Sequence, residues 1–74
     1  MLKFCRIEVY DNVPAYERKM RSKILSMKED MAIKYARNRG KEGKITIITN
    51  KLTNEIIYEN HCGIEKIIEE MKKE

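Results

Sequence analysis

The sequence predicts an α+β domain of two layers with the element order β-α-β-β-α, in which a three-stranded sheet carries a long and a short helix on one face. Three observations support this fold class. Residues 2–10 alternate as a strand does, residues 14–39 repeat apolar side chains at helical spacing, and residues 45–59 form two strand-like runs around a polar loop. A chain of 74 residues makes one domain, so we assign residues 1–74 to it.

The first predicted strand covers residues 2–10. Cys5, Ile7 and Val9 fall on one side of it and are expected to face the core, because successive side chains of a strand point to opposite faces. Asn12 then offers a helix cap, and Pro14 suits a first helical turn because its missing N–H has no partner there.

The second predicted element is a helix that runs without interruption over residues 14–39. Its apolar stripe is spaced by three or four positions and consists of Tyr16, Met20, Ile24, Met27, Met31 and Tyr35. Gly40 is placed for a left-handed C-cap. At a rise of about 1.5 Å per residue the helix would reach about 39 Å. Strands of this protein would span roughly 20–30 Å, so one end of the helix is expected to project beyond the sheet.

The remaining elements are a β-hairpin and a short helix. Residues 41–44 read as a turn, 45–49 as a β-branched strand, 50–54 as a loop and 55–59 as a second strand. The last helix is expected to begin near Asn60 or His61, and its apolar positions are Ile64, Ile67, Ile68 and Met71. The order β-α-β-β-α resembles that of DinI-type proteins and of several small phage-encoded proteins, a resemblance in element order that assigns no role to any residue.

The composition and the motifs favour a binding protein over an enzyme. No glycine-rich phosphate loop, H-E-x-x-H or G-x-S-x-G motif occurs. His61 and Cys62 are adjacent but lack a third, orienting group, so we predict no catalytic residue, no metal site and no cofactor. No apolar run reaches the ~20 residues of a membrane span, and the first residues do not read as a signal peptide. We therefore expect a cytoplasmic protein without a membrane partner.

The charge is unevenly distributed along the chain. Residues 1–44 hold twelve Lys/Arg and six Asp/Glu, a net +6, whereas residues 45–74 hold four and six, a net −2. Such a basic half favours anionic partners. The candidate nucleic-acid-binding residues lie on the predicted helix and the turn after it: Arg18, Arg21, Lys28, Arg37, Arg39, Lys41 and Lys44. The alternative is that their long stems only cover the edges of the buried stripe.

A protein partner is the second functional hypothesis. In this hypothesis the chain is a small adaptor or inhibitor that acts through the long helix, the uncovered sheet face or a sheet edge. One version of the hypothesis gives it a phage origin. The candidate contact residues, for a host or cognate protein or for a second copy in a homodimer, are Tyr16, Met20, Met31 and Tyr35. The alternative is that these side chains fill the core.

Overall fold

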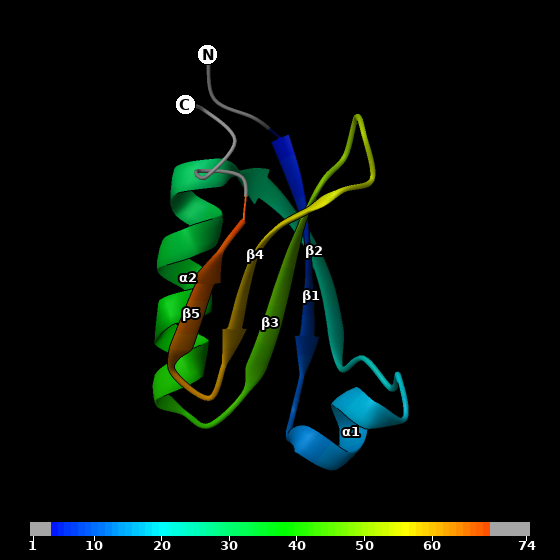
Figure 1. Cartoon of the computed structure of the whole chain (residues 1–74), viewed down its shortest axis with the longest axis vertical. Helices are drawn as coiled ribbons and strands as arrows, with labels where there is room; N and C mark the ends of the chain where they lie inside the picture. Colours follow the sequence, from blue (N-terminus) through cyan, green and yellow to red (C-terminus); the bar gives the residue numbers. More distant parts are fainter. Residues whose placement is uncertain (1–3, 69–74) are drawn as a thin grey trace.

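A five-stranded antiparallel sheet with one long helix across it forms the fold in the computed structural model, which describes residues 4–68 (Figure 1). The elements in chain order are β1 (Phe4–Tyr10), α1 (Val13–Glu17), β2 (Lys23–Lys28), α2 (Glu29–Lys41), β3 (Ile45–Asn50), β4 (Ile56–His61) and β5 (Ile64–Ile67). The strand order across the sheet is β2-β1-β3-β4-β5. Since β2 and β3 both pair antiparallel with β1, they run parallel to each other, and α2 connects them.

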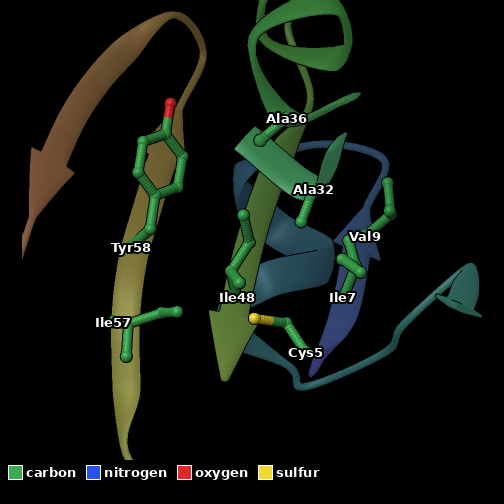
Figure 2. Packing of buried hydrophobic residues seen from close by; sticks show 8 residues of the cluster. All are labelled: Cys5, Ile7, Val9, Ala32, Ala36, Ile48, Ile57 and Tyr58. Atoms are coloured by element: carbon green, nitrogen blue, oxygen red, sulfur yellow. The ribbon is translucent and has the colours of Figure 1, made fainter. Parts of the chain in front are cut away.

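The core lies between α2 and one face of the sheet (Figure 2). Cys5, Ile7 and Val9 alternate towards α2 from β1 and are completely or almost completely buried. Ala32 and Ala36 meet them from the helix, and these small side chains let the helix backbone lie close to the sheet. The prediction that this side of β1 faces the core is confirmed.

The predicted strands are confirmed, and so is the α+β class. The described part of the first strand begins at Phe4, and residues 2–3 of its predicted range lie outside the described residues. The predicted hairpin is formed by β3 and β4, which pair from Ile45 with His61 to Thr49 with Ile56. An extra residue in β4, Ile57, shifts the register between Ile48 and Thr49.

The three-stranded sheet and the continuous helix over residues 14–39 are wrong. The chain instead forms the one-and-a-half-turn helix α1, the edge strand β2 and then α2. Helix α1 ends in a Schellman arrangement, in which Lys19 has φ 59° and the Met20 amide donates to the Ala15 carbonyl at 2.9 Å. Residues 23–28 then pair with β1 along their whole length, which removes them from any helix.

The short helix predicted to begin near Asn60 or His61 is also wrong. Cys62 and Gly63 form a two-residue turn, and residues 64–67 are the strand β5, paired antiparallel with β4. Met71 lies outside the described residues. With five strands, the element order no longer matches the β-α-β-β-α order on which the resemblance to DinI-type and phage-encoded proteins rested.

Two further details of the helices differ from the prediction. Gly40 is not a left-handed C-cap: it lies inside α2 and is buried, and Gly43 takes the positive φ of 80°. The helices are not on one face, because Tyr16 of α1 packs on the side of the sheet opposite α2. None of the described helices is long and apolar enough to cross a membrane.

Candidate functional site

The sheet face that α2 leaves uncovered, here called the outer face, carries the most distinctive group of side chains. The alternation of β1 places Phe4, Arg6, Glu8 and Tyr10 on this face. The pairing registers add the residues opposite them on the other strands, which include Ile24, Lys28, Ile45, Ile47, Ile56, Glu59, His61, Ile64 and Lys66.

A chain of aromatic contacts fixes α1 against one end of the outer face. The Tyr16 ring lies between Tyr10 and His61, with centroid separations of 5.2 and 5.1 Å and nearly perpendicular planes. Nε2 of His61 is 2.8 Å from Oε1 of Glu59. Locally, α1 forms because the Asn12 side chain accepts a hydrogen bond from the Ala15 amide at 2.8 Å and Pro14 occupies the first turn.

Between α1 and the sheet the outer face is hollowed to a volume of about 560 Å³. Tyr10, Ile47 and Ile56 line it from the sheet, and Tyr16, Glu17 and Lys19 line it from α1 and the residues after it. Glu8 and Arg21 complete the lining. The hollow therefore has an apolar base and a charged margin.

The charged margin is organised around Glu8. Nη1 of Arg21 lies 2.7 Å from Oε2 of Glu8, and Nε of Arg6 lies 3.8 Å from the same oxygen. Nε of Arg6 is buried and makes no hydrogen bond. One carboxylate thus lies between two guanidinium groups, which leaves a net positive charge at this point.

Burial raises the pKa of the Tyr10 hydroxyl, and the nearby Glu8 carboxylate adds to the shift. The Tyr10 hydroxyl is therefore protonated and uncharged near neutral pH. The base of the hollow can make apolar contacts and neutral hydrogen bonds, whereas ionic contacts must come from its margin.

Exposed apolar side chains lie on the outer face, and one of them, Ile56, lines the hollow. Phe4 and Ile24 are each 52% exposed, Ile56 is 41% exposed and Ile64 is 75% exposed. Within residues 4–68, these four make up half of the large hydrophobic residues that are exposed; the other four are spread over α1, α2 and loops. An apolar surface of this kind next to a concavity is typical of a binding site.

The structure does not bring the predicted nucleic-acid-binding residues together on one helix. Arg18 and Arg21 follow α1, Lys28 ends β2, and the others lie on α2 or just before β3. Four of the seven are in ion pairs: Arg21 with Glu8, Arg37 with Glu65, Arg39 with Glu42, and Lys44 with both Asp11 and Glu42. Phosphate binding by the seven residues stays a prediction.

The predicted partner or dimer residues are likewise divided between the two sides of the sheet. Tyr16 packs on the outer face, whereas Tyr35 packs against the core under α2, with the Arg39 guanidinium 5.1 Å from its ring centroid. Met20 and Met31 are exposed, one in the loop after α1 and the other on α2. The continuous stripe that linked the four residues does not exist, and their contact with a partner stays a prediction.

His61 and Cys62 point to different neighbours. His61 contacts Tyr16 and Glu59 on the outer face, whereas the Cys62 thiol donates to the Gly43 carbonyl at 3.4 Å. In the described part of the chain, no three His, Cys, Asp or Glu side chains are grouped so that they could hold a metal ion.

The sequence predicted an uncovered sheet face as one possible partner surface, but it did not place Ile24 and Ile64 there because both were assigned to helices. One signal was available in residues 45–48, where three isoleucines in four positions indicate a strand that is covered on both faces. The structure agrees, since Ile47 points to the outer face and is only 5% exposed.

No protein-family model, curated protein or solved structure matches this chain. Its function must therefore be inferred from the geometry of the outer face.

Proposed function

We propose that this chain is a small non-enzymatic binding protein that docks a partner protein on the outer face of its sheet. The observation that carries the proposal is the group of exposed apolar side chains, Phe4, Ile24, Ile56 and Ile64, on the same sheet face as the hollow beside α1. Specific protein interfaces combine an apolar centre with a polar margin. The outer face has both parts.

The kind of side chain on the outer face favours a protein over single-stranded nucleic acid. Sheets that bind single strands present aromatic rings on which bases stack. Here Phe4 has the Lys51 ammonium 5.0 Å from its ring centroid, and Tyr10 and Tyr16 are engaged with each other. The other exposed apolar residues of this face are isoleucines, which pack well against protein side chains but do not stack on bases.

The proposal is tested by affinity capture with matched surface variants. Ile24→Ser and Ile56→Ser change the outer face, whereas Leu52→Ser changes a residue that is 93% exposed in the loop between β3 and β4. A tagged wild-type protein and each variant are used to capture proteins from a lysate of the encoding organism, and the captured proteins are quantified by mass spectrometry. We expect one stoichiometric partner that the wild type and Leu52→Ser retain and that both outer-face variants lose. A partner captured equally by all four proteins would contradict the proposal.

Nucleic-acid binding is the second candidate function, favoured by the net +6 of residues 1–44. Of the seven cations first considered, Arg18, Lys28 and Lys41 make no ion pair within residues 4–68 and are free to contact phosphates. Fluorescence anisotropy with labelled duplex and single-stranded DNA and RNA, at two salt concentrations, tests this candidate. Binding through phosphates must weaken steeply with salt, and the absence of binding at low salt would exclude it.

A further inference from the structure

The outer face carries more positive than negative charge. The count covers the strand residues that point to this face, the residues that line the hollow, and Lys51, which lies over the Phe4 ring. It includes six cations, Arg6, Lys19, Arg21, Lys28, Lys51 and Lys66, and three carboxylates, Glu8, Glu17 and Glu59. The difference, six minus three, is a net +3 on one side of the molecule. Complementary charge steers partners towards a surface and selects among them.

The hollow adds a shape requirement to this charge. Its volume of about 560 Å³ falls within the roughly 300–1,000 Å³ of ordinary ligand sites. Ile47, at the base, is almost fully buried, whereas Ile56, beside it, is 41% exposed and offers uncovered apolar area. Lys19 and Arg21 lie at the margin, next to this apolar base. A ligand with a large apolar side chain and neighbouring carboxylates would match the apolar base of the hollow and the cations at its margin.

We infer that the outer face binds an acidic segment of a partner protein, with one large apolar side chain of that segment in the hollow and its carboxylates beside Lys19 and Arg21. This inference rests on the proposed function and specifies the chemistry of the partner. A second copy of the chain is a poor occupant of this face, because two outer faces of net +3 would repel each other. Glu8 does not cancel the attraction, since Arg6 and Arg21 share its single charge.

The test uses a phage-displayed library of random peptides selected on the immobilised full chain. Enriched peptides are synthesised with a fluorescent label, and their affinities are measured by anisotropy for the wild type and three variants. Lys19→Glu reverses a charge at the hollow, and Ile56→Asp places a charge on its apolar base. Lys34→Glu reverses an exposed charge on α2, on the other side of the sheet, and is the matched control. Circular dichroism verifies that each variant is folded.

We expect the enriched peptides to combine a large aliphatic or aromatic residue with several Asp or Glu. Their affinity should fall about tenfold in Lys19→Glu and at least as much in Ile56→Asp, should decrease with added salt, and should be unchanged in Lys34→Glu. Enriched peptides that are neutral or basic but still depend on Ile56 would overturn the acidic partner and leave the proposed function standing. Peptides insensitive to both outer-face variants, or no enrichment at all, would overturn both. Displacement of the peptides by a single-stranded oligonucleotide of thymidines would assign the face to nucleic acid instead.

Discussion

Gly40 of α2 and Asn60 of β4 approach so closely that no side chain fits between them. A Cβ atom added at Gly40 would lie 2.9 Å from the Gly63 backbone nitrogen and closer still to Oδ1 of Asn60. Asn60 is almost completely buried, and its Oδ1 accepts a hydrogen bond from the Gly63 amide at 2.8 Å. The end of α2 is therefore packed directly on the turn between β4 and β5.

We expect Gly40→Ala to destabilise the protein, although alanine is the better helix former. The helix preference would contribute about 1 kcal/mol of stability, whereas overpacking a tight contact costs roughly 1–3 kcal/mol. We expect a net loss of about 1 kcal/mol in the free energy of unfolding, measured by urea denaturation. Asn38→Ala, at an exposed position of the same helix, is the control and should be neutral or slightly stabilising. A stabilised Gly40→Ala would show that the helix does not lie this close to the sheet.

The turn between β4 and β5 predicts a stabilising substitution at Cys62. The two turn residues, Cys62 and Gly63, have φ values of 57° and 100°, and His61 pairs with Ile64 on either side. Two-residue hairpins with positive φ at both positions favour Asn-Gly. Because left-handed backbone costs most L-residues roughly 1–2 kcal/mol and asparagine less, Cys62→Asn should raise the free energy of unfolding by up to about 1 kcal/mol. Leu52→Asn is the control, because Leu52 lies in a loop and does not have a positive φ, and it should not raise the free energy of unfolding. Equal effects of the two substitutions would contradict the assigned turn.

The strands that were predictable from the sequence are those with local signals. Residues 45–49 are β-branched throughout, and their partner in β4 follows after a short polar loop, so the hairpin needs no distant information. The strand at residues 64–67 had no such local signal, because the spacing of Ile64 and Ile67 also fits a helix. The adjacent Gly63, which follows the left-handed Cys62, was the missed signal for a tight turn.

The edge strand β2 could not be separated from a helix by its pattern alone. Ile24 and Met27 suit one side of a helix, while Leu25 and Met27 equally suit one side of a strand. The structure selects the strand because β1 has a free edge that these residues occupy from Lys23 to Lys28. Glu29 and Asp30, which begin α2, marked the true helix start through their favourable interaction with the helix dipole.

Recognising the candidate site from the sequence would have required the same pairing of β2 with β1. Only the register that places Ile24 and Ile47 on either side of Glu8 shows that they share one face. No local sequence pattern contains that information, because the three residues are far apart in the chain. The set of side chains on the outer face is thus a product of the sheet topology, and mistaking β2 and β5 for helices was enough to hide the places of Ile24 and Ile64 on it.

The two cysteines are expected to differ in reactivity. Cys5 is completely buried between β1 and α2, whereas Cys62 is exposed in its turn. A thiol-specific chromogenic reagent should therefore modify one cysteine in the native protein and both after denaturation in urea, since access limits the reaction. Cys62→Ser should abolish the native reaction. Rapid modification of both thiols in the native wild type would contradict the burial of Cys5.

The ion pair between Arg37 and Glu65 predicts a stability loss in acid. The hydrogen bond from Arg37 lowers the pKa of the Glu65 carboxyl, and a hydrogen bond with the Tyr58 hydroxyl lowers it further. A carboxyl whose pKa is lower in the folded state contributes stability above its unfolded pKa, near 4.5, and loses that contribution as the pH falls through the folded value.

The wild type should therefore be more stable than Glu65→Gln near pH 7, and the difference in urea midpoint should shrink as the pH falls below about 4.5. Glu17→Gln is the control, because Glu17 makes no ion pair in the described part of the chain; its difference from the wild type should not vary in this way. Arg37→Met should weaken the pH dependence of stability without abolishing it, since it removes the larger cause of the shift and leaves the hydrogen bond with Tyr58. A constant difference between wild type and Glu65→Gln from neutral pH to pH 3 would show that this pair does not couple protonation to folding.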